Sequence, residues 1–219
     1  MGELSFEELI YKVAVWAIPV LYAITLHEVA HGWMANKLGD TTAKMLGRLS
    51  LNPLKHIDPI GTILVPVMLL LINSPFLFGW AKPVPVNFRN LKNYRRDMMI
   101  VAAAGPIANL IMALGWALLL WLFYVLIPEA NVQQGLMQMS VAGILINLIL
   151  MVFNLLPIPP LDGGRVLSGL TSPRISQALD RIEPYGMFII LGLLVVGVLP
   201  MILNPVVGSL FGLFTAWMS

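Results

Sequence analysis

Long apolar stretches constrain the fold of this 219-residue chain more than any other feature. Four of them, at about 9–38, 98–127, 136–156 and 186–203, contain few charged residues. An α-helix rises about 1.5 Å per residue, so each stretch is long enough to cross a hydrocarbon layer about 30 Å thick. Only 11% of the residues are charged, against roughly 25% in soluble domains. The sequence therefore predicts an all-α polytopic membrane protein in which residues 1–219 form a single membrane domain.

Two further apolar segments bring the expected number of membrane helices to about five to six. Residues 206–217 follow Asn204-Pro205 and are short for a crossing. Residues 60–78 lie between two groups of basic residues. If this segment returned on the side where it entered, twelve of the thirteen Lys and Arg residues would share one face, with only Lys12 elsewhere. Because basic residues concentrate in cytoplasmic loops, we expect a re-entrant or broken segment at 60–78 and an N-terminus outside the cell.

His27, Glu28 and His31 place metal-binding chemistry inside the first apolar stretch. Residues four apart lie one above the other on a helix, so both imidazoles can reach one ion, with the Glu28 carboxylate beside them. Ionisable side chains are costly in lipid, and a cluster at membrane depth therefore indicates function. The sequence contains no cysteine, so any metal here must take nitrogen or oxygen ligands.

A third ligand is needed, because a catalytic zinc ion usually has three protein ligands. The candidates are the remaining histidine and the acids near the apolar stretches: His56, Asp40, Asp58, Asp97, Glu129 and Asp162. Asp162 stands out because three prolines precede it closely and two glycines follow it directly. Such a rigid turn at the end of a membrane helix can hold a carboxylate at a fixed depth. The pattern favours Asp162.

Three ordered motifs resemble those of the site-2 protease family of intramembrane zinc metalloproteases. They are His27-Glu28-x-x-His31, Ala104-Gly105-Pro106-x-x-Asn109 and Asn154-x-x-Pro157-x-x-Pro160-x-Asp162-Gly163. The resemblance implies one catalytic Zn2+ ion bound by His27, His31 and Asp162, with Glu28 as the general base. It also implies that Asn154 and Asn109 help to hold substrate near the metal. The chain is similar to a compact prokaryotic member without the PDZ or CBS domains of other branches.

The resemblance implies hydrolysis of a peptide bond in or near a transmembrane segment of a membrane-protein substrate. The expected place is the cytoplasmic face of the plasma membrane. A peptide bond inside a helix is poorly exposed, so the substrate should bind in an extended form by addition to a free strand edge. Residues 45–51 and 80–87 are candidates for that edge, and we expect a small β element near the active site. The expected partners are the substrate and the lipid bilayer, and no nucleic acid.

Several residues have simpler interpretations. Asn109 is explained as well by a hydrogen bond to a neighbour as by substrate contact, and Asn147 better by an interhelical hydrogen bond. His56 and Asp58 lie beside Asn-Pro and Asp-Pro pairs, which favour a structural turn. For the whole chain, the alternative function is a metal-ion-handling membrane transporter. Transporter folds usually contain related halves, and the sequence has no visible internal repeat.

Overall fold

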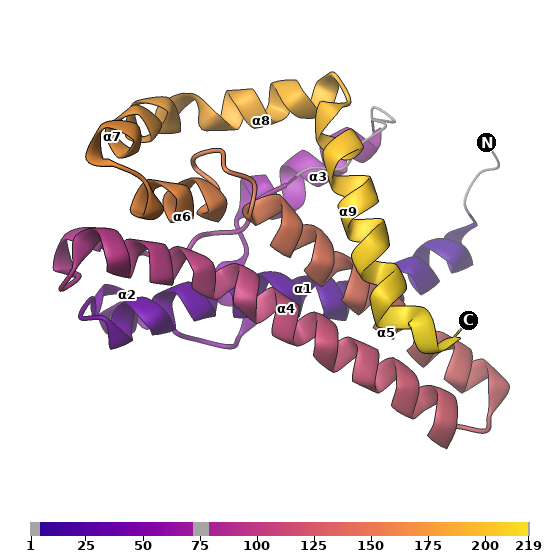
Figure 1. The fold of residues 1–219 in the computed structure, drawn as a ribbon. Coiled ribbons are helices and arrows are strands. Elements are labelled where there is room, and N and C mark those ends of the chain that lie inside the picture. Colours follow the sequence, from indigo (N-terminus) through magenta and orange to yellow (C-terminus); the bar gives the residue numbers. More distant parts are fainter. Residues whose placement is uncertain (1–4, 72–78, 219) are drawn as a thin grey trace.

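The computed structural model describes residues 5–71 and 79–218, and its regular structure is helical (Figure 1). Within these residues, four helices are long and apolar enough to span a membrane. They are α1 (Phe6–Lys37), α4 (Tyr94–Leu126), α5 (Ala130–Asn154) and α9 (Val198–Thr215). Their length and composition are those of a multi-pass membrane protein.

Shorter helices connect and flank these four. In chain order they are α2 (Thr42–Met45), η1 (Pro53–His56), η2 (Pro59–Leu64), α3 (Val65–Leu71), η3 (Phe88–Asn90), α6 (Asp162–Leu170), α7 (Pro173–Ile182), η4 (Glu183–Tyr185), α8 (Gly186–Val195) and η5 (Ala216–Met218).

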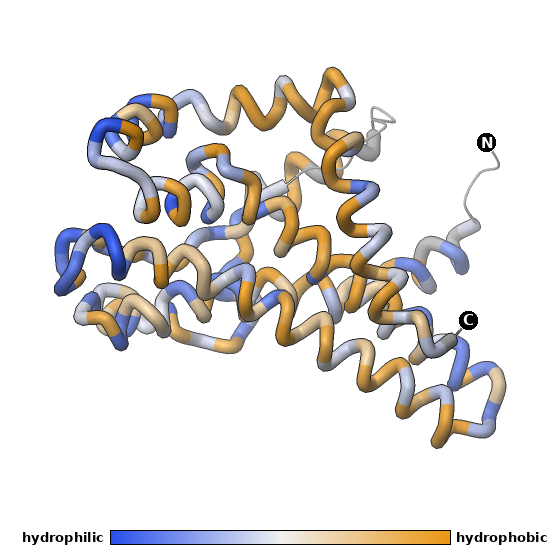
Figure 2. Tube along the Cα trace, viewed as in Figure 1, coloured by the Kyte–Doolittle hydropathy of each residue, from blue (hydrophilic) through white to orange (hydrophobic). Residues whose placement is uncertain are grey.

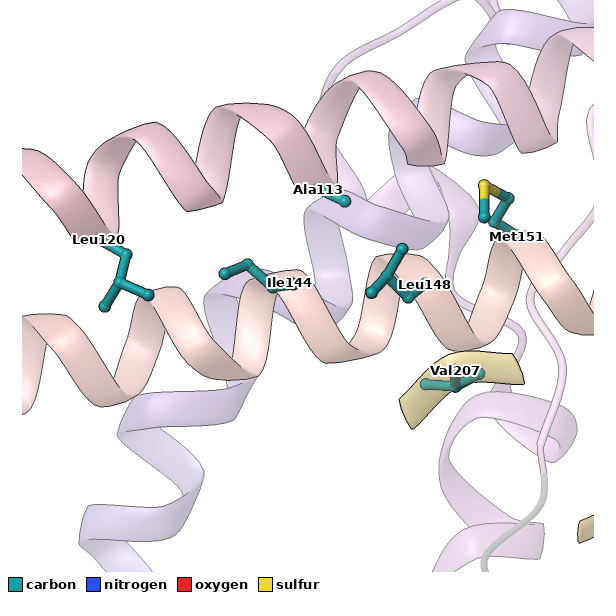
Figure 3. Close-up of a cluster of buried hydrophobic side chains, with 6 residues drawn as sticks. All are labelled: Ala113, Leu120, Ile144, Leu148, Met151 and Val207. Atoms are coloured by element: carbon teal, nitrogen blue, oxygen red, sulfur yellow. The ribbon is translucent and has the colours of Figure 1, made fainter. Parts of the chain in front are cut away.

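Helix α4 is at the centre of the bundle, where it packs against α1, α5 and α6. A buried apolar cluster holds α4, α5 and α9 together (Figure 3), and its members are Ala113, Leu120, Ile144, Leu148, Met151 and Val207. Gly143 on α5 brings the backbones closer still, because a Cβ there would overlap the Trp116 ring. Small residues allow this kind of close helix contact in membrane proteins. The packing fixes the positions of α4 and α5, which carry groups of the candidate site.

Hydrophilic residues gather at one end of the bundle (Figure 2). This end comprises the C-terminus of α1, α2, the N-terminus of α4, and α7. These elements carry basic side chains at Lys37, Lys44, Arg95, Arg96, Arg174 and Arg181. Six of the twelve basic residues predicted to share one face therefore lie on elements that come together at this end.

The predicted stretch 186–203 is not one helix. Helix α8 ends at Val195, and the chain turns at Gly197, whose φ of 78° is left-handed. A left-handed residue cannot continue a right-handed helix. Helix α9 then runs through Pro205, because a proline inside a membrane helix removes only one hydrogen bond. The predicted boundary at Asn204-Pro205 is wrong, and the expected five to six membrane helices become four long ones among the described residues.

The segment predicted to be re-entrant begins with η2, a π-helix, and continues as α3 to Leu71. Residues 72–78 lie outside the described part of the chain. Beyond them, the Trp80 backbone N–H donates to the Gly61 carbonyl (3.1 Å), and the Thr62 hydroxyl donates to the Trp80 carbonyl (2.8 Å). The chain therefore comes back to the place where the segment started, and this geometry supports a re-entrant or broken segment.

No β-strand is present in residues 5–71 and 79–218, so the predicted small β element near the active site is not confirmed. Residues 80–87 are extended, but two prolines in this segment lack an N–H. The Val84 N–H donates to the Glu28 side chain, and the Asn87 N–H donates to the Asp40 side chain. Side chains thus accept hydrogen bonds from the backbone N–H groups that would otherwise pair with a neighbouring strand.

Candidate metal centre

His27 and His31 lie on one face of α1, one turn apart. Their Nε2 atoms are 3.0 Å from each other. His27 is buried and His31 is partly buried. Because α1 is continuous from Phe6 to Lys37, the helix geometry itself sets the spacing of the two imidazoles.

Asp162, the first residue of α6, reaches the same point directly after the turn that follows α5. Its Oδ2 atom lies 3.3 Å from His27 Nε2 and 3.2 Å from His31 Nε2. The turn folds tightly on itself: a Cβ on Gly164 would lie 2.5 Å from the Pro159 nitrogen. Glycine is required after Asp162 because the backbone returns so closely to the residues before it.

The three facing atoms suit a zinc ion. Tetrahedral zinc with bonds of about 2.0–2.2 Å separates its ligand atoms by roughly 3.3–3.6 Å, close to the 3.0–3.3 Å found here. The Asp162 Oδ2 atom is buried and has no hydrogen-bond partner, so a cation would satisfy an orphaned acceptor. Within the described residues, these three form the one group of His, Cys, Asp or Glu side chains that could hold a metal.

Helix α4 supplies the hydrogen bonds that orient both imidazoles. His31 Nδ1 donates to the Val101 carbonyl (2.7 Å), and His27 Nδ1 donates to Asn109 Oδ1 (2.5 Å). With each Nδ1 acting as a donor, each Nε2 is left free for a metal. Between these contacts lies Gly105, where a Cβ would be 2.6 Å from Cε1 of each imidazole. Helix α4 can approach α1 this closely only because residue 105 has no side chain.

Glu28, next to His27, is oriented by the backbone of the 80–87 segment. Its Oε2 atom accepts a hydrogen bond from the Val84 N–H (2.8 Å). Val84 is buried against α1 at Gly32, where a Cβ would lie 2.6 Å from Val84 Cγ1. A carboxylate has about four acceptor positions, so this bond orients Glu28 and leaves it able to accept a proton.

Asp40 anchors the far end of the same segment. It is fully buried and accepts hydrogen bonds from the Asn87 N–H (2.7 Å), the Asn90 amide (2.9 Å) and the Thr42 hydroxyl (2.5 Å). The segment that contacts Glu28 is thereby tied to the end of α1.

We expect Asp40→Asn to destabilise the protein in a pH-dependent way. Burial acts to raise the Asp40 pKa, but hydrogen bonds from Thr42, Asn90 and Asn87 outweigh it and lower the pKa from the usual 3.8. A lowered native pKa stabilises the fold above the unfolded-state pKa, and this stabilisation is lost as pH falls through the native pKa. The variant should lose about 1–3 kcal/mol at neutral pH, and the difference from wild type should shrink below about pH 4.

Denaturant unfolding in detergent at a series of pH values measures this difference. A difference that stayed constant down to about pH 3 would contradict the role given to the ionised carboxylate.

The other residues predicted from the sequence lie as follows. Asn154 donates its amide to the Leu150 carbonyl in its own helix (3.0 Å), and the structure records no hydrogen bond between Asn154 and the three candidate ligands, all of them described residues. His56 is buried and donates Nε2 to the Ser50 carbonyl (2.9 Å). Asp58 accepts from the first N–H groups of η2. The interpretation of His56 and Asp58 as turn residues is confirmed.

Two groups at the site were missed by the sequence reasoning, namely the Val101 carbonyl and the Val84 N–H. Backbone groups occur at every residue, so no sequence signal marks these two. Asn109 belongs to a predicted motif, and in the structure its side chain contacts His27. Asn109 therefore hydrogen-bonds to His27, one of the three candidate metal ligands.

Comparison with known proteins identifies relatives of the chain. The model of the family described as Peptidase family M50 matches residues 123–197, a range that includes Asp162. "Putative zinc metalloprotease YwhC" of Bacillus subtilis (strain 168) is 41% identical over 91% of this chain and 90% of its own length. "Putative zinc metalloprotease Rip2" of Mycolicibacterium smegmatis is 31% identical over 80% of this chain and 64% of its own length. The protein of the same name from Mycobacterium tuberculosis (strain H37Rv) is 30% identical over 89% and 70%. No solved structure matches the chain.

Proposed function

Since this chain belongs to peptidase family M50, the site-2 proteases, we propose that this membrane zinc metalloprotease hydrolyses a peptide bond in or near a transmembrane segment of a membrane protein. The observation that carries the proposal is the convergence of Asp162 with His27 and His31, two residues of the apolar helix α1, at one point. Residues 1–219 would act as one metalloprotease domain.

In the proposed site, His27, His31 and Asp162 hold one Zn2+ ion. When bound, zinc acts as a Lewis acid that activates water and polarises the scissile carbonyl. Glu28 takes the proton from the attacking water and passes it to the leaving amine, and the Val84 N–H keeps its carboxylate in place. Asn154, at the end of α5, is the proposed substrate contact.

The proposed site lies towards the cytoplasmic face of the plasma membrane. His31 is six residues before Lys37, the last residue of α1, or roughly 9 Å along the helix. Helix α2, the start of α4 and helix α7 lie at that end (Figure 1) and contain basic residues, which are typical of cytoplasmic loops.

Removal of the metal should abolish cleavage. The purified protein, treated with a chelator in detergent, is mixed with a single-pass membrane protein as a model substrate. We expect cleavage to fall to background and to return with about one equivalent of zinc, because the Lewis acid is required for water activation. Gel analysis and mass spectrometry of the fragments would follow the reaction and locate the bond. Cleavage by metal-free protein would contradict the proposal.

The alternative, a metal-ion transporter, gains no support from the relatives, since each of those described above is named as a zinc metalloprotease. The same protein in vesicles separates the two functions. Zinc flux without peptide hydrolysis would favour transport, and hydrolysis without flux would favour the protease.

A further inference from the structure

The two candidate histidine ligands are oriented by acceptors of different kinds. His31 Nδ1 donates to the Val101 backbone carbonyl, which can only accept. His27 Nδ1 faces the side-chain amide of Asn109, which has an accepting oxygen at one end and a donating NH2 group at the other. If this amide were reversed, its NH2 group would face Nδ1, and the His27 proton would move to Nε2, where the metal binds. The orientation of the Asn109 amide therefore decides whether His27 can be a ligand.

A chain of buried hydrogen bonds fixes that orientation. Asn109 Nδ2 donates to Asn147 Oδ1 (2.9 Å) and to the Ala23 carbonyl (3.3 Å). Asn147 Nδ2 in turn donates to the Gly143 carbonyl (2.8 Å), which can only accept. The Gly143 carbonyl thus turns the Asn147 oxygen towards Asn109, and Asn147, with the longer bond to the Ala23 carbonyl beside it, turns the Asn109 oxygen towards His27.

Burial allows these hydrogen bonds only one arrangement. Asn109 and Asn147 are both fully buried, so no solvent can replace a lost partner. An unpaired buried donor costs about 1–3 kcal/mol, and reversal of one amide would leave both asparagines with mismatched partners. The Asn147–Gly143 bond lies within α5, whereas the bonds of Asn109 join α4 to α5 and to α1.

We propose that Asn147 is a positioning residue for the metal centre, which sets the Asn109 amide and through it the tautomer of His27 and the affinity for zinc. The role is more than the interhelical hydrogen bond expected from the sequence. It rests on the proposed metal site, and it does not depend on proteolysis because its readout is zinc affinity.

The experiment measures zinc affinity of the full-length protein in detergent, by competition with a chromophoric chelator. Asn109→Leu should weaken zinc binding by about 10–100-fold, and Asn147→Leu by about 10-fold, as outer-shell changes do. The matched control is Ser140→Ala, two turns away on α5. Ser140 is also buried, but its hydroxyl donates to the Leu136 carbonyl in its own helix, so zinc affinity should not change. Unaltered affinity in Asn147→Leu would overturn the proposal.

A double variant tests whether Asn147 acts by orienting the Asn109 amide or only by packing against it. In Asn109→Asp, both ends of the side chain are acceptors, so nothing remains for Asn147 to orient. Addition of Asn147→Leu should then cause no further loss of zinc affinity. A further loss of about 10-fold in this background would overturn the proposal, because it would show a packing effect.

Two more variants keep the test decisive. If Asn147→Leu does not fold, Asn147→Asp still offers an acceptor to Asn109 and should keep zinc affinity close to wild type, whereas a large loss would overturn the proposal. His31→Ala tests the metal site itself. Undiminished zinc binding in His31→Ala would refute the proposed site, while a loss there combined with no effect of Asn147→Leu would refute only the role of Asn147.

Discussion

Replacement of Glu28 by glutamine should slow peptide hydrolysis severely while zinc stays bound. Glutamine has nearly the shape of glutamate, and its oxygen can still accept the hydrogen bond from the Val84 N–H. It cannot take a proton from water, so the rate should fall by about 10²–10⁴-fold, the usual contribution of a general base. Metal analysis and a cleavage assay with a transmembrane substrate measure the two properties separately.

Glu28→Ala is the companion variant, because it removes both the base and the acceptor for Val84. We expect it to lose activity like Glu28→Gln and in addition to unfold at a lower temperature, since the buried Val84 N–H loses its partner. Cleavage at the wild-type rate by Glu28→Gln would remove Glu28 from its proposed role.

The long helices could be predicted because apolar runs of sufficient length have few alternatives in a membrane. Helices α1, α4 and α5 correspond to the first three predicted stretches. The residues that the structure brings together were also visible in the sequence, since a histidine pair with a glutamate is rare inside an apolar run. Asp162 was marked by the prolines and glycines around it, and the structure shows that the two glycines lie where the backbone folds closely on itself.

The errors have two physical sources. The first is that apolar character is continuous across 186–203, and only the left-handed turn at Gly197 divides α8 from α9. A glycine can adopt that conformation, but its presence in a sequence does not predict a left-handed turn. The second is that an extended segment becomes a strand only if another backbone pairs with it. In 80–87, the N–H of Val84 donates to the Glu28 side chain instead of to another backbone. This pairing depends on tertiary contacts, so the local sequence does not predict it.

Gly105→Ala should disrupt the metal centre, because residue 105 packs directly against both candidate histidine ligands. A Cβ at this position would lie 2.6 Å from Cε1 of both imidazoles. The rings cannot move aside without loss of their hydrogen bonds to Val101 and Asn109. The added methyl group must therefore push α4 away from α1 or displace the rings, and zinc affinity should fall by at least about 100-fold, with cleavage lost.

Gly115→Ala is the matched control for this prediction, since it makes the same change in the same helix. A Cβ at Gly115 would meet nothing within 4 Å. Alanine favours a helix over glycine by about 1 kcal/mol, so this variant should bind zinc normally and unfold at the wild-type temperature or slightly above it. Zinc competition and thermal unfolding of both variants provide the comparison. Equal zinc affinities in the two would mean that the metal centre tolerates a wider separation of α1 and α4, and that the shape of residue 105 is not what holds the histidines in place.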